Sequence, residues 1–209
     1  MTFSFEMLSE TFIALCCKYN SDTAAVDRLW AEIETQYSDR HYHNLDHLSD
    51  MHFHLQACRH LLRDWDSVLF ALFYHDFIYD ATSKSNEENS AVEAEKRLTA
   101  LRLPIEKIAH VVHLIDSTKS HKVSDDNDVN LFTDADLSIL GSPQAKYEQY
   151  CSNVRKEYGI FPDLLYKPGR RKVLQHFLDM PYIFKTDFFR TKLESISRHN
   201  IKSELKKLS

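Results

Sequence analysis

The sequence predicts an all-α fold in one domain that spans residues 1–209. Three observations favour this class: only 3 of the 209 residues are glycine, 43% are apolar, and the apolar residues recur at intervals of three and four. This spacing places apolar side chains on one face of a helix, and few glycines leave few of the tight turns that an all-β fold needs. No change in composition marks a domain boundary, so we expect a single helical bundle.

Composition and charge exclude several classes of protein. The net charge of −5 provides no overall basic field for nucleic acid, and no apolar run reaches the roughly 18 residues of a membrane span. Four cysteines occur without C-x-x-C spacing, which is typical of a reduced compartment. We therefore expect a cytoplasmic protein that binds neither nucleic acid nor membranes.

The N-terminal segment is expected to be a packed helix rather than a secretion signal. It lacks the basic residues that open a signal peptide. Its apolar residues recur at the spacing of a helix face. They are Phe5, Leu8, Phe12 and Leu15.

Two histidine-bearing helices follow. Residues 45–63 carry apolar side chains every three or four positions, and His47 lies at the edge of that stripe. Between 66 and 79 the chain reads VLFALFYHDFIY, which is apolar on every face and predicts a helix that is buried all round. His75 and Asp76 are expected to lie on this buried helix.

A capping signal and a proline mark the next two helices. Ser85 and Glu88 form the S-x-x-E pattern of a capping box, which opens a helix. Pro104 can occupy the first turn of the following helix, which is expected to end near Thr118. The inner stripes are expected to be Ala91, Ala94, Leu98 and Leu101 in the first helix, and Ile105, Ile108, Val112 and Ile115 in the second.

Four more helices are predicted after a polar loop at 119–130. Gly141 closes the first of them, and Pro181 separates the last two. The four helices are expected at 131–140, from 143 onward, at about 169–179 and at about 187–207.

The dipeptide His75-Asp76 is the first indication of chemistry. Burying a carboxylate in an apolar helix costs several kcal/mol unless something compensates, and a divalent cation is the strongest compensator. Histidine and aspartate together offer nitrogen and oxygen ligands suited to Mn, Fe, Co, Ni, Zn or Mg. His47 and Asp136 are also expected to point inward, so we predict that the four side chains share one ion.

Helical geometry leaves two candidates for the last carboxylate ligand. Asp136 shares a helix face with the apolar residues Phe132 and Leu140. Asp134 lies about 200° away around the helix and is therefore the second candidate.

The order of His47, His75-Asp76 and Asp136 on successive helices resembles the HD superfamily of metal-dependent phosphohydrolases, an all-helical fold that binds a metal through these positions. Segments that look like a cytoplasmic branch of this superfamily run through most of the chain. They are RHYHNLDHL, ALFYHDFIYD, NEENSA, STKSH, FTDADLSILG, VRKEYG, GRRKVLQHFL and ESISRHNI. YHNLDH and ADLS are also similar to motifs of class I cyclic-nucleotide phosphodiesterases, but the pocket that clamps the nucleotide base in those enzymes has no counterpart in this sequence.

The resemblance implies that the four residues bind the metal and that His43 is the general acid that protonates the leaving oxygen. Because His43 and His47 are one helical turn apart, an imidazole that does not bind the ion can stand beside it and transfer a proton. The remaining charge of a bound phosphate would be held by Lys119, His121 and Arg155. The expected substrate is a phosphomonoester or phosphodiester of a nucleotide or another small metabolite.

The roles of three further residues are undecided, and two other functions are possible. Glu87 could serve a metal ion or stabilise the first turn of its helix, and His113 and His121 could be ligands of a second ion. Some HD-type proteins hold two irons and activate oxygen, which is the leading alternative function. The other alternative is a non-catalytic module that senses a nucleotide and keeps its metal for folding.

Overall fold

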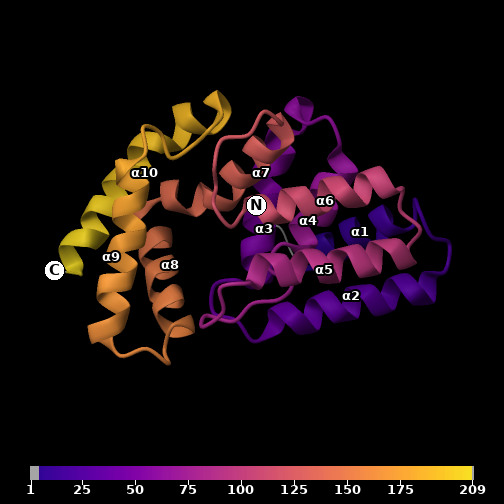
Figure 1. Cartoon of the computed structure of the whole chain (residues 1–209), viewed down its shortest axis with the longest axis horizontal. Coiled ribbons are helices and arrows are strands. Elements are labelled where there is room, and N and C mark those ends of the chain that lie inside the picture. The colour runs from indigo at the N-terminus through magenta and orange to yellow at the C-terminus, as the bar shows by residue number, and fades with distance from the viewer. Residues whose placement is uncertain (1–4, 209) are drawn as a thin grey trace. The chain divides into compact units, whose positions relative to one another are not determined.

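The computed structural model describes residues 5–208, and every regular element in them is a helix (Figure 1). This confirms the all-α prediction. The elements are α1 (Phe5–Cys16), α2 (Thr23–Ser38), α3 (Leu45–Ala57), η1 (Arg59–Leu61), α4 (Trp65–Tyr74), α5 (Asn86–Ala100), α6 (Ile105–Ser117), α7 (Asn127–Asp136), η2 (Leu137–Gly141), α8 (Gln144–Glu157), α9 (Asp163–Asp179) and α10 (Asp187–Lys207), where η1 and η2 are 3₁₀ helices.

The helices group into two compact units, Met1–Thr133 and Asp134–Ser209. The first unit contains α1–α6 and most of α7, and the second contains η2 and α8–α10. The expectation of one domain over the whole chain stays a prediction. Among the helices of residues 5–208, none is both long enough and apolar enough to cross a membrane.

Helix α4 is the centre of the first unit. Every residue from Ser67 to Tyr74 is buried, and the helix packs against α1, α3, α5 and α6. The Tyr37 hydroxyl, on α2, donates a hydrogen bond of 3.2 Å to the Phe73 carbonyl. A sequence that is apolar on every face therefore forms a helix that is covered on every face, as predicted.

The predicted helix at 66–79 is too long, because α4 ends at Tyr74. The Phe77 amide bonds the Tyr74 carbonyl in a tighter i to i+3 turn, and Ser90 Oγ then holds both the amide and the carbonyl of Ile78. These bonds turn the chain out of the helix. His75 and Asp76 consequently lie at the carboxyl end of α4 rather than inside it.

Helices α1, α5 and α6 largely follow their predicted stripes. In α1, Leu8, Phe12 and Leu15 are buried, and the side chain of Phe5 lies outside the part that the structure describes. In α5, all four residues of the predicted stripe are buried. In α6 the prediction for Ile105 is wrong, because this residue is 72% exposed in the first turn. The buried residues of α6 are Ile108, Val111, Leu114 and Ile115.

The capping box predicted for α5 is also wrong. Ser85 occupies the N-cap position but forms no side-chain capping hydrogen bond. Glu88 forms an ion pair with Lys119 instead of reaching back to the helix start. The capping-box pattern considers only neighbouring residues, whereas Lys119 lies just after the carboxyl end of α6 and contacts Glu88 only in the folded protein.

The second unit packs α10 closely against η2. A Cβ atom added to Gly141 would lie only 2.6 Å from Leu193 Cβ, so this glycine permits the close approach of the two helices. Helix α9 begins at Asp163, six residues before the predicted start, and continues through Pro168. Arg155 explains the early start, because its guanidinium bonds the Tyr158 and Phe161 carbonyls and the Asp163 carboxylate and so holds the turn before α9.

Candidate metal centre

His47 lies in the first turn of α3 and is positioned by the cap of that helix. Asn44 is the N-cap residue, and its side-chain oxygen accepts hydrogen bonds from the amides of Asp46 and His47. The His47 side chain is buried, and its Nδ1 atom is 3.3 Å from the Tyr42 hydroxyl. The opposite ring nitrogen, Nε2, therefore faces away from Tyr42.

His75 caps the carboxyl end of α4 and is almost fully buried. Its Nδ1 atom is 2.9 Å from the Leu72 carbonyl. Because a carbonyl only accepts, Nδ1 donates its proton to it, and this bond fixes the ring orientation and leaves Nε2 available as the atom that would face a metal.

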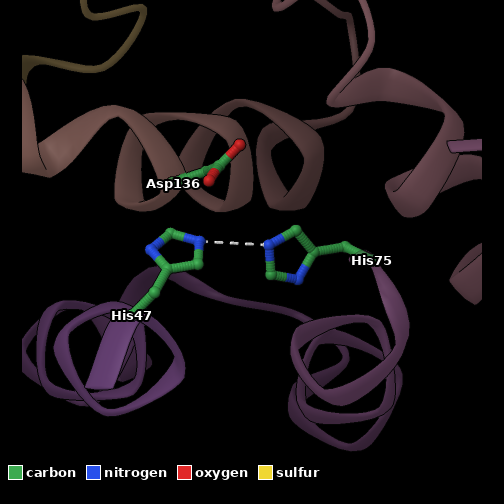
Figure 2. A group of neighbouring side chains, drawn as sticks. All are labelled: His47, His75 and Asp136. Carbon is green, nitrogen blue, oxygen red and sulfur yellow. Dashed lines mark hydrogen bonds between the residues drawn. The ribbon is translucent and has the colours of Figure 1, made fainter. Parts of the chain in front are cut away.

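The two imidazoles face each other. Figure 2 shows the two rings pointing toward each other. The distance between His47 Nε2 and His75 Nε2 is 3.2 Å. Two nitrogens that bind one ion tetrahedrally at about 2.0–2.1 Å lie about 3.3 Å apart. The observed distance therefore fits two adjacent ligands of one ion.

Asp76 places a carboxylate oxygen beside the two Nε2 atoms. One carboxylate oxygen, Oδ2, is 3.1 Å from His75 Nε2 and 3.8 Å from His47 Nε2. Burial alone would raise the pKa of this carboxyl, but the rings of His75, His43 and His47 hold the pKa well below its ordinary value. Asp76 is thus a carboxylate ready to bind a cation, and it lies in the first unit together with both histidines.

Asp136 is the last residue of α7, a helix whose residues up to Thr133 belong to the first unit. One ligand atom each from His47, His75 and Asp136 lies within 4.8 Å of the others, and this group could hold a metal ion (Figure 2). Asp76 is not a member of this group, although its Oδ2 atom lies 3.1 Å from His75 Nε2. The donors at or beside the group are two imidazole nitrogens and carboxylate oxygens. Such a set suits Mn, Fe, Co, Ni or Zn.

His43 lies beside this cluster rather than in it. Its ring centroid is 6.0 Å from that of His47, and the ring stacks on Tyr79 at 4.1 Å with an interplanar angle of 29°. Tyr42 packs edge-on against the same imidazole at 4.8 Å. The two tyrosines hold the half-buried His43 ring in a fixed orientation without adding it to the ligand set.

Asp134, the second candidate for the last ligand, has a structural role. The carboxylate is fully buried and accepts hydrogen bonds from the amides of Lys185 and Thr186 and from the Thr186 hydroxyl, at 2.7–2.8 Å. Thr186 is the N-cap residue of α10. Asp134 therefore ties the start of α10 to the end of α7, and it is not a member of the group formed by His47, His75 and Asp136.

This role predicts a loss of stability rather than a loss of metal. Asp134→Ala should lower the free energy of unfolding by about 3 kcal/mol, because it leaves two amides and a hydroxyl without their acceptor and the buried Lys185 ammonium without its ion-pair partner. Asp134→Asn should cost less and should keep the metal content of the wild type. Urea unfolding and elemental analysis measure the two effects, with Asp187→Ala as a control, because the Asp187 side chain is 90% exposed.

The cations predicted to hold phosphate are engaged elsewhere. Lys119 donates a hydrogen bond of 2.8 Å to the Lys84 carbonyl and pairs with Glu88. Arg155 binds Asp163 and stacks on Tyr166, with its guanidinium carbon 4.6 Å from the ring centroid. These contacts give both residues structural roles in their own units.

Arg155 also lines a pocket of about 440 Å³ within the second unit, between α8, α9 and α10. The charges of this pocket are already paired, since Lys207 binds Glu148 at 2.7 Å and Arg155 binds Asp163 at 2.8 Å. The pocket therefore offers no concentration of positive charge to a phosphate.

The residues considered for a second ion do not converge. His113 is exposed on α6, Glu87 lies half-buried in the first turn of α5, and His121 adopts a left-handed backbone with φ of 48°. Among residues 5–208, neither of the two groups that could hold an ion includes any of these three.

The other group consists of His110, Asp126 and Asp128, which were not among the metal ligands predicted from the sequence. Asp128 is buried and accepts hydrogen bonds from the Arg63 and Asp64 amides, so its carboxylate anchors the chain before α4. His110 Nε2 is 3.2 Å from an oxygen of Asp126. These contacts account for the group as part of the packing of the first unit.

Arg40 is a residue of the site that no sequence motif indicates. Its guanidinium donates hydrogen bonds to the carbonyls of His43, Asp76 and Phe77, and so contacts both segments of the site. The only sequence signal was its position directly before the HYHNLDH stretch.

Comparisons with known proteins add no family assignment. No protein-family model matches the chain, and neither the curated proteins nor the solved structures gave a match.

Proposed function

We propose that the chain is a metal-dependent phosphohydrolase of the HD type, which hydrolyses a phosphomonoester or phosphodiester of a nucleotide or small metabolite. The observation that carries this proposal is the convergence of His47, His75 and Asp76, with the two Nε2 atoms 3.2 Å apart and a carboxylate oxygen 3.1 Å from one of them. The order of these residues, followed by Asp136, supports the resemblance to the HD superfamily.

In this proposal the cluster holds the ion and His43 moves the proton. His47, His75, Asp76 and Asp136 would hold a divalent ion, which would polarise a phosphoryl oxygen and activate water. The Leu72 carbonyl keeps the proton of His75 on Nδ1 and so keeps Nε2 directed at the ion. Water adds to phosphorus and loses a proton to the solvent, the bond to the leaving oxygen breaks, and protonated His43 donates its proton to that oxygen.

The partner in this proposal is a small phosphorylated molecule in the cytoplasm, and no nucleic acid or membrane is involved. The iron-oxygenase alternative needs further histidine ligands, but the described group contains neither His113 nor His121. We therefore favour hydrolysis over oxygen activation.

A substrate screen tests the proposal. Protein stripped of metal should be reconstituted separately with Mn, Co, Ni, Mg and Zn and incubated with phosphorylated metabolites and p-nitrophenyl esters. We expect phosphate or alcohol release that requires a metal and is abolished by a chelator, because the nucleophile depends on the ion. His47→Ala, purified in parallel, controls for contaminating phosphatases.

Two results would contradict a hydrolase. Stoichiometric metal binding and nucleotide binding without any turnover would identify a sensor module. A pair of irons with oxygen-dependent absorbance changes would identify an oxygenase.

A further inference from the structure

Arg40 lies between the two segments that carry the candidate site. One segment is the turn that bears His43 together with the first turn of α3, which bears His47. The other segment is the carboxyl end of α4, with the C-cap residue His75 and Asp76 directly after it. The guanidinium Nη1 donates to the His43 carbonyl at 3.3 Å and to the Asp76 carbonyl, and Nη2 donates to the Phe77 carbonyl at 2.9 Å.

These carbonyls need a donor. The last carbonyls of a helix and of the turn that follows have no intrahelical partner, and a cation is favoured there by the helix dipole. At the end of α4, Arg40 Nη1 donates a hydrogen bond to the Asp76 carbonyl. The same Nη1 atom also donates to the His43 carbonyl.

Two aromatic rings fix the guanidinium in place. Its central carbon is 4.8 Å from the ring centroid of Tyr37 and 5.6 Å from that of Tyr79. Tyr79 also stacks on His43, so Arg40, Tyr79 and His43 form one packed series. A lysine ammonium cannot reproduce this arrangement, because it lacks the planar fork that reaches several carbonyls at once.

We propose that Arg40 is a positioning residue of the metal centre. It clamps the backbone of His43 to the backbone of Asp76 and Phe77, and so sets the spacing between the ligands of α3 and those at the end of α4. If Arg40 has this role, replacing it should lower the affinity of the site for a metal ion whether or not the protein is a hydrolase. An effect of Arg40 on the reaction rate, in contrast, rests on the proposed hydrolase function.

Arg97 provides a matched control in the same unit. Its guanidinium carbon is 4.4 Å from the ring centroid of Phe77, and it pairs with Glu32 and Glu93. Its described hydrogen bonds go to Glu32 and Glu93 rather than to the carbonyls of the two site segments. Replacing Arg97 therefore removes a comparable stacked and paired arginine from the first unit without releasing the clamp.

The test measures Mn²⁺ affinity by titration calorimetry and the melting temperature of the metal-free protein for Arg40→Lys, Arg40→Met, Arg97→Lys and Arg97→Met. Both Arg40 variants should bind Mn²⁺ about 10- to 100-fold more weakly, which is the usual effect of losing a partner that orients metal ligands. The Arg97 variants should lower the melting temperature to a similar extent and keep the affinity of the wild type within about 2-fold.

Three outcomes separate the possibilities. Arg40→Lys, which keeps the charge and is expected to fold, would overturn the positioning role if it lost melting temperature but bound Mn²⁺ like the wild type. The positioning role would also be overturned if the Arg97 variants weakened Mn²⁺ binding as much as the Arg40 variants. The loss of affinity would then result from lower stability of the fold rather than from loss of the Arg40 contacts. A wild-type protein that binds no divalent ion would instead overturn the metal centre on which the proposed function depends.

Discussion

Asp76→Ala is expected to abolish metal binding and phosphate-ester hydrolysis together. The variant removes the carboxylate whose oxygen lies 3.1 Å from His75 Nε2. The donors that remain, His47, His75 and Asp136, carry one negative charge fewer and should hold a divalent ion far more weakly. Elemental analysis of metal per chain, together with the rate on the best substrate of the screen, measures the two losses.

The metal-free Asp76→Ala protein should remain folded. The carboxylate is 16% exposed, and its ion-pair contacts are with the rings of the two histidines rather than with the apolar core. Asp80→Ala is the matched control, because Asp80 lies four residues along the chain, is exposed, and bonds Thr82. Full metal occupancy in Asp76→Ala, or an equal loss in Asp80→Ala, would contradict the assignment.

His43→Ala is expected to keep the metal and lose rate. A positioned general acid contributes about 10²- to 10⁴-fold, so kcat for an alkyl phosphate should fall by that factor. The loss should be much smaller for a p-nitrophenyl ester, because p-nitrophenolate is a stable anion and needs little protonation as it leaves. His47→Ala should instead lose the metal.

The comparison of leaving groups decides the role of His43. His41→Ala controls for general effects of removing an imidazole from this segment, since the His41 side chain is exposed two residues before His43. An equal loss for alkyl and p-nitrophenyl esters would remove the acid role. Unchanged activity would leave His43 as a packing partner of Tyr79.

Much of the helical architecture could be predicted from local pattern alone. The stretch before His75 is apolar on every face, so a helix formed from it must be buried whichever way it turns, and α4 is buried in this way. The stripe of Ala91, Ala94 and Leu98 likewise requires one inward face. Such predictions succeed because helical periodicity is a property of neighbouring residues.

The ends of the helices depend on contacts that pattern does not contain. Helix α4 stops at Tyr74 because Ser90, on another helix, holds the backbone of Ile78. Helix α9 starts early because Arg155 holds the turn before it. In both cases a distant side chain supplies hydrogen bonds that local propensity does not anticipate.

For the candidate site, the sequence by itself determined the kinds of residue and their order: histidine, histidine-aspartate and aspartate, in segments that also carry apolar residues. Only the tertiary structure shows which groups each carboxylate meets. Asp134 meets the amides of Lys185 and Thr186, more than fifty residues away, whereas Asp136 joins His47 and His75. The tertiary structure also gave Arg40 its place, because the carbonyls that it bonds come together only after α3 and α4 have packed. Periodicity specifies the face that a side chain occupies, but its hydrogen-bond partners depend on which distant backbone groups the fold brings opposite it.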